Sequence, residues 1–143
     1  PPLLEAKNIR KEFPGVLALD NVSVRVEAGE VLAVVGENGA GKSTLMKIMA
    51  GVYQPDQGEL LFQGEPVRFA GVTDAMQRGI SLIHQELNLA ENLGATANIF
   101  LGREKKKLGC FLDRAAMTKI ASELLERVGL SKNLANVPVY HLA

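Results

Sequence analysis

The segment Gly36-Glu37-Asn38-Gly39-Ala40-Gly41-Lys42-Ser43 directly follows the apolar run Val31-Leu32-Ala33-Val34-Val35. A glycine, four residues and then Gly-Lys-Ser form the pattern of a phosphate-binding loop, and an apolar run before it is typical of a strand covered on both faces. The sequence therefore predicts a strand over 31–35, a phosphate cradle over 36–43 and a helix that begins near Gly41. An ordinary glycine-rich turn between a strand and a helix is the alternative interpretation.

The residue types in this loop suit an anion. Glycines let consecutive backbone N–H groups point at one phosphate, and the following helix adds the positive end of its dipole. In such loops the lysine, here Lys42, reaches the β- and γ-phosphates, and the hydroxyl of Ser43 can bind Mg²⁺. The loop alone leaves kinases, GTPases and many ATPases open.

The composition sets broad limits on the protein. A chain of 143 residues suits one domain with a sizeable core. The 16 basic side chains balance 16 acidic ones, so no overall field favours nucleic acid or an anionic membrane. The single cysteine, Cys110, and the lack of an apolar leader at the start indicate a cytosolic setting. Because the chain starts at Pro1 without methionine and stops at Ala143 without a terminating signal, we expect it to be part of a longer protein.

Alternating patterns flank the loop. Residues 4–10 and 22–26 alternate apolar and polar side chains, which predicts two half-buried antiparallel strands. After the loop, apolar residues at helical spacing predict a helix of about ten residues that ends at Gly51 in the left-handed conformation. The turn 55–58 then predicts a further hairpin with strands over 59–62 and 66–69. The apolar positions of the helix are Leu45, Ile48 and Met49.

The second half begins with a short helix and a further strand. Thr73 is the predicted N-cap of a helix that ends before Gly79, and residues 80–83 are the predicted strand. We expect residues 87–112 to be irregular, with Lys105-Lys106-Lys107 in a solvated loop rather than on phosphate.

Asp113 is then expected to cap the longest helix of the chain. Gly129 is expected to end it. Its apolar stripe more often indicates core packing than a partner-binding face. The stripe consists of Met117, Ile120, Ala121, Leu124, Leu125 and Val128.

The arrangement of Phe13, the loop and Gln85 resembles the ATP-binding cassette (ABC) ATPases. In that family an aromatic ring upstream of the loop stacks on adenine, and the resemblance assigns this role to Phe13, with Val16 packing on the base. The family's Q-loop glutamine, which contacts Mg²⁺ and the attacking water, matches Gln85. The resemblance implies catalytic roles for Lys42 and Gln85, and Mg²⁺ contacts from Ser43 and Gln85. The full set expected to bind MgATP is Phe13, Val16, Gly36, Glu37, Asn38, Gly39, Ala40, Gly41, Lys42, Ser43, Thr44 and Gln85.

Two further stretches are similar to the ATPase subunits of bacterial carbohydrate importers of the ribose, galactose, xylose and arabinose type. They are residues 83–89 and 98–104. The resemblance implies an α/β fold: a P-loop NTPase core with an antiparallel β subdomain at the N-terminus and the start of a helical subdomain. We expect the core and β subdomain over 1–90, and the helical part over 91–143. The family's signature, Walker B and switch histidine motifs would follow beyond these residues.

The resemblance implies an ATP-binding subunit that couples ATP hydrolysis to sugar uptake, with ATP and Mg²⁺ as cofactors. Its partners would be transmembrane permease subunits and a second ATP-binding cassette, and indirectly a sugar-binding protein, with no nucleic acid. Its place would be the cytoplasmic face of the inner membrane. These residues alone are expected to be inactive, because the catalytic glutamate of the family follows Walker B. A nucleotide-binding piece without hydrolytic activity and a small P-loop kinase are the alternatives, and the sequence does not indicate which sugar is carried.

Overall fold

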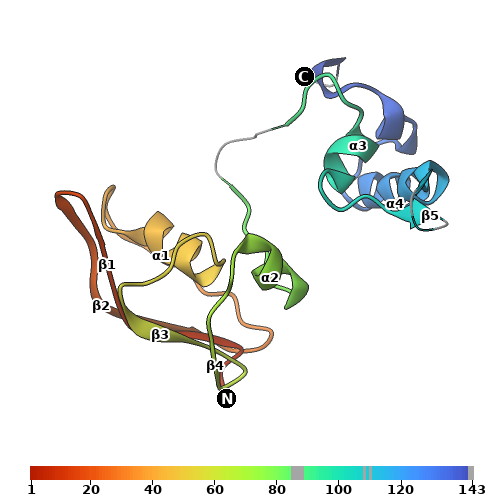
Figure 1. The fold of residues 1–143 in the computed structure, drawn as a ribbon. Coiled ribbons are helices and arrows are strands. Elements are labelled where there is room, and N and C mark those ends of the chain that lie inside the picture. Colours follow the sequence, from red (N-terminus) through yellow and green to blue (C-terminus); the bar gives the residue numbers. More distant parts are fainter. Residues whose placement is uncertain (85–88, 108, 110, 142–143) are drawn as a thin grey trace. The chain divides into compact units, whose positions relative to one another are not determined.

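The computed structural model describes residues 1–84, 89–107, 109 and 111–141. The chain divides into two compact units, Pro1–His84 and Gln85–Ala143. The first unit holds an antiparallel sheet with helices, and the second is mainly helical (Figure 1). The predicted order of an antiparallel β subdomain followed by helices is confirmed, and the domain boundary after residue 90 stays a prediction.

The sheet of the first unit has four antiparallel strands in the order β2-β1-β3-β4. Their bounds are β1 Leu4–Phe13, β2 Val16–Val26, β3 Gln57–Phe62 and β4 Glu65–Val67. The strands predicted from alternation are therefore present, and β1 and β2 are longer than the pattern indicated. Since β1 lies between β2 and β3, its backbone is paired along both edges.

A bulge in β1 keeps its apolar side chains on one face. Leu4 and Ala6 are buried two residues apart, but the next buried residue is Ile9. The register shifts between Ala6 and Ile9, where Asn8 adopts a left-handed conformation with φ 52°. Asn8 Nδ2 donates to Asn21 Oδ1 at 2.8 Å. The extra residue thus moves the strand's odd-numbered side chains onto the core face beyond the bulge.

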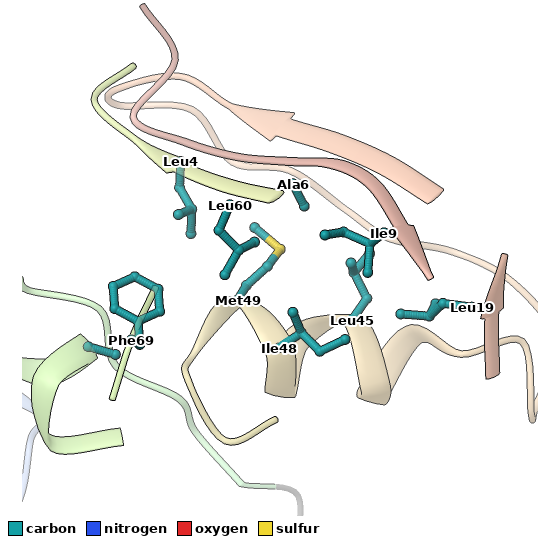
Figure 2. Packing of buried hydrophobic residues seen from close by; sticks show 10 residues of the cluster. Leu4, Ala6, Ile9, Leu19, Leu45, Ile48, Met49, Leu60 and Phe69 are labelled. Atoms are coloured by element: carbon teal, nitrogen blue, oxygen red, sulfur yellow. The ribbon is translucent and has the colours of Figure 1, made fainter. Parts of the chain in front are cut away.

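One helix covers this face of the sheet. Helix α1 spans Lys42–Met49, and Figure 2 shows it beneath the strands, with side chains from both layers in the space between them. Gly51 follows it with φ 74°, so the predicted apolar stripe and left-handed stop are both confirmed. Helix α2, Val72–Gln77, adds Ala75 to the same core. The buried members of this core are Leu4, Ala6, Ile9, Leu19, Leu45, Ile48, Met49, Leu60, Phe69 and Ala75.

Two predicted strands and one predicted cap are wrong within the described residues. Residues 31–35 and 80–83 form no strand, and Val31, Val35 and Ile83 are 96%, 90% and 93% exposed. An apolar run becomes a strand only when neighbouring strands pair with its backbone, and none of the described strands lies beside either run. Thr73 lies inside α2, whose N-cap is Gly71.

The described residues of the second unit form two α-helices, a short hairpin and two 3₁₀ helices. Their bounds are α3 Ala95–Phe100, β5 Lys106–Lys107, β6 Phe111–Leu112, α4 Arg114–Arg127, η1 Lys132–Asn136 and η2 Val139–His141. Residues 87–112 were predicted to be irregular, and the described part of that stretch instead holds α3 and the hairpin. Lys106 and Lys107, predicted to lie in a loop, belong to the hairpin but are exposed.

Helix α4 begins and ends where the sequence predicted. The Asp113 carboxylate accepts the N–H of Ala116 at 3.0 Å, and Gly129 has φ 80°. Its stripe is narrower than predicted, because Leu124 and Val128 are exposed. The buried core of this unit consists of Ala95, Phe100, Met117, Ala121, Leu125 and Ala135.

Candidate phosphate-binding site

The glycine-rich loop leads directly into α1. The Leu45 N–H donates to the Gly41 carbonyl at 2.9 Å, the first hydrogen bond of the helical type in α1. The N–H groups of the residues just before Leu45 therefore come ahead of the regular hydrogen bonds of the helix. Amides at this end of a helix point outward with the positive end of the dipole. The residue at the N-cap position is Gly41, and its helix end has no side-chain cap. The beginning of α1 therefore presents donors to the loop, as an anion site requires.

Lys42 folds back over the loop that precedes it. Its Nζ donates to the carbonyls of Gly36 and Glu37, both at 2.7 Å. Within the loop, the Ala40 N–H donates to the Glu37 carbonyl at 3.2 Å and so forms a turn. The ammonium is thus bound to the first two residues of the loop by two hydrogen bonds.

Two glycines of the loop have conformations that other residues avoid. Gly39 has φ 85° and Gly41 has φ 86°, the left-handed region that costs an L-residue about 1–2 kcal/mol. A side chain at Gly41 would also meet the Ala18 carbonyl oxygen and come within 2.8 Å of Leu19 Cδ2. The end of the loop is therefore packed against β2, and glycine is required there for both reasons.

The strand that Gly41 touches also carries one of the predicted base-binding residues. Val16 begins β2 and pairs with Phe13 across the tight turn that joins β1 to β2. The side chain of Val16 is 59% exposed, and Phe13 is half-buried. Ala18, which contacts the loop at Gly41, lies two residues further along β2. Strand β2 thus begins at the turn next to Phe13 and, two residues later, contacts the end of the phosphate loop.

Ser43 and Thr44 lie in the first turn of α1. Ser43 is exposed and Thr44 is half-buried. A hydroxyl oxygen is a ligand that suits Mg²⁺, so the exposed Ser43 is compatible with the predicted metal contact. Gln85, the second predicted metal contact, lies outside the described residues. Among the described residues, no cluster of three or more His, Cys, Asp or Glu side chains could hold a metal ion.

Sequence reasoning missed the neighbours of Phe13. Its ring packs on Tyr53, with centroids 5.4 Å apart and planes at 70°. Lys11 Nζ lies 5.5 Å from the Phe13 ring centroid and 2.8 Å from Asp56 Oδ1. The hydrogen bond from Lys11, followed by that from the Glu12 N–H, holds the pKa of Asp56 below its usual value. No local pattern pointed to Tyr53 or Asp56 as neighbours of this region, since these contacts join residues forty or more positions apart in the sequence.

The profile of the ABC transporter family matches residues 19–142 of this chain. The chain belongs to this family. The match covers the phosphate loop, α1 and nearly all of the second unit. The ABC resemblance inferred from the motifs is therefore confirmed.

Among curated ABC relatives, the putative ribose/galactose/methyl galactoside import ATP-binding protein 2 of Burkholderia lata is 53% identical over 128 residues, which are 90% of this chain and 24% of that protein. The ribose import ATP-binding protein RbsA of Rhodopirellula baltica is 52% identical over 128 residues, again 90% of this chain, and 25% of that protein. The chain thus spans about a quarter of the length of the curated relatives it matches.

Solved ABC cassettes share the fold. A nucleotide-free ATP-binding cassette from an ABC transporter superposes with a TM-score of 0.81 at 24% identity, covering all of this chain and 60% of that one. The ADP conformation of such a cassette gives a TM-score of 0.77 at 23% identity, covering all of this chain and 59% of that one. The α/β cassette fold is therefore confirmed. Within the described residues, every helix of this ABC chain is too short or too polar to span a bilayer.

Proposed function

We propose that this chain carries the nucleotide-gripping part of an ABC cassette in a protein that couples ATP hydrolysis to carbohydrate import. The observation that carries the proposal is the position of Lys42. Lys42 is the first residue of α1, and its ammonium lies 2.7 Å from two loop carbonyls, which a phosphate oxygen would replace as its partner. The names of the relatives, which are ribose or galactoside import ATP-binding proteins, support carbohydrate as the cargo.

Each part of the site has a proposed role. Phosphoryl transfer to water depends on positioning and charge neutralisation, and Lys42 with the loop amides from Gly36 to Thr44 supplies both for the β- and γ-phosphates. Phe13 stacks on adenine and Val16 packs on it. Ser43 would hold Mg²⁺ together with Gln85, and the metal would neutralise charge on the phosphates. Gln85 would also orient the attacking water.

The proposed partners follow from the proposed role in carbohydrate import. The subunit works beneath transmembrane permease subunits, at the cytoplasmic face of the inner membrane, with a second ATP-binding cassette. A sugar-binding protein acts on the permease rather than on this chain. The alternative is that these residues bind nucleotide without hydrolysing it. A phosphate-release assay distinguishes ATP hydrolysis from binding alone.

The test compares nucleotide binding by wild type and Lys42→Ala in the intact gene product. At tenfold excess over its dissociation constant, MgATP stabilises a binding site by about 1.4 kcal/mol, which raises the melting temperature by a few degrees. We expect a clearly larger shift in wild type than in Lys42→Ala, which retains only nucleotide binding elsewhere in the gene product. Lys106→Ala, which removes an exposed lysine of the second unit, is the matched control and keeps the shift. Equal melting of wild type with and without millimolar MgATP contradicts the proposal.

A further inference from the structure

Tyr53 occupies a fixed position just beyond the end of α1. The N–H groups of Val52 and Tyr53 both donate to the Lys47 carbonyl, at 2.8 and 3.3 Å. A side chain at Gly51 would come within 2.9 Å of the Gly71 carbonyl and of Phe69 Cβ, so this turn is closely packed. Helix α1 therefore carries the phosphate loop at its beginning and fixes the backbone of Tyr53 at its end.

The ring of Phe13 is held by groups outside its own hairpin. Tyr53 packs on it at 5.4 Å between centroids, and Lys11 Nζ lies over it at 5.5 Å. Lys47 Nζ in turn lies 5.7 Å from the Tyr53 ring centroid. Two aromatic rings and two cations thus form one set of contacts that joins β1 to the end of α1.

A carboxylate fixes the cation beside Phe13. Asp56 accepts Lys11 Nζ at 2.8 Å and the Glu12 N–H at 2.7 Å, and the Asp56 N–H donates to the Arg10 carbonyl at 2.9 Å. The side chain of Lys11 is only 15% exposed. The turn after Tyr53 is therefore bound to β1 immediately before Phe13.

An aromatic platform binds a base more tightly when its ring is already held in place, because less rotational freedom is lost on binding. We propose that Tyr53 is a positioning residue that holds Phe13 ready for the purine base, with the Lys11–Asp56 pair supporting the same ring. The inference rests on the proposed nucleotide site. Tyr53, which lies outside the phosphate loop, would thus affect the affinity for the base and leave the affinity for the phosphates unchanged.

The test measures binding of MgATP and of magnesium tripolyphosphate by calorimetry in the intact gene product. Lys42→Ala supplies the baseline for binding elsewhere in that product. Tyr53→Leu and Tyr53→Met both remove the ring while retaining most of its volume, and Tyr53→Phe restores the ring without the hydroxyl. Tyr140→Leu removes an exposed aromatic ring of the second unit and is the matched control.

We expect the two aliphatic variants to weaken MgATP about two- to tenfold, the range of an aromatic pair contact, and to leave tripolyphosphate within about twofold of wild type. Tyr53→Phe and Tyr140→Leu should bind ATP as wild type does. In a Phe13→Ala background, removing the Tyr53 ring should have no further effect, since the ring it positions is gone.

Several results would overturn this inference. Equal weakening of ATP and tripolyphosphate means that Tyr53 acts on the fold of the loop. An unchanged loss in the Phe13→Ala background means that Tyr53 acts independently of Phe13. Wild-type ATP affinity in both aliphatic variants removes the positioning role while leaving the proposed function intact. Failure of wild type to bind either ligand overturns the proposed function, and this inference with it.

Discussion

The three glycines of the phosphate loop should respond differently to the same added methyl group. Gly36 has no positive φ, and its added Cβ would lie 3.5 Å from Ala40 Cβ, an ordinary contact. Gly39 is left-handed but has nothing within 4 Å of the new atom. Gly41 is left-handed and closely packed against Ala18 and Leu19. The three alanine variants therefore separate backbone conformation from packing within one loop.

The expected costs follow from these surroundings. Gly36→Ala should stay within about 0.5 kcal/mol of wild type or be slightly more stable, because alanine restricts the unfolded chain. Gly39→Ala should lower the free energy of unfolding by about 1 kcal/mol, the left-handed penalty less that gain. Gly41→Ala adds overpacking of about 1–3 kcal/mol against a backbone carbonyl that cannot rotate away. Its total cost should be about 2–4 kcal/mol.

Urea denaturation followed by circular dichroism measures the series. With a typical slope of about 1–3 kcal/mol per molar urea, a loss of 2 kcal/mol moves the midpoint by roughly 1 M, which is readily resolved. Equal midpoints for Gly39→Ala and Gly41→Ala would show that the contact with β2 contributes nothing. A Gly36→Ala variant as unstable as Gly41→Ala would refute the argument from backbone conformation.

Three other predictions concern the rest of the chain. Asp113→Ala should destabilise the second unit by about 1 kcal/mol through loss of the N-cap, and Asp113→Asn should restore most of it; equal urea midpoints for all three proteins would contradict this. Asp56→Asn should be less stable than wild type at neutral pH, and the difference should disappear as the pH falls below 3.8, because the folded-state pKa of Asp56 is depressed and its stabilisation is lost on protonation. Residues 1–143 expressed alone should self-associate through the exposed run 31–35, so a monodisperse monomer in light scattering would count against that expectation.

Features that depend on neighbours in sequence were predicted well. The stripe of α1 and its stop at Gly51 follow from helical spacing and from the tolerance of glycine for positive φ. The cap at Asp113 and the stop at Gly129 rest on the same local rules. The geometry of the loop could likewise be expected, since the left-handed residues Gly39 and Gly41 both fall within its pattern.

Features that depend on distant partners were not predictable in this way. Residues 31–35 have the composition of a buried strand, but the described strands leave their backbone unpaired. At α2, Asp74 accepts the Ala70 N–H at 3.0 Å from within the helix, and the expected cap at Thr73 is not formed. The contact between Phe13 and Tyr53 joins the end of β1 to the segment after α1, and no sequence period relates the two.

The exposed run before the loop also bears on how the protein is made. Ribosomes add about 5–20 residues per second, and within the described residues the side chains of Val31 and Val35 stay 96% and 90% exposed. This run leads straight into Gly36, whose carbonyl accepts a hydrogen bond from Lys42 at 2.7 Å, while the opposite end of the loop is fixed through Gly41 and α1. During synthesis the nascent segment would be a natural client for a chaperone. A surface that covers the run would also restrain the backbone that enters the loop at Gly36.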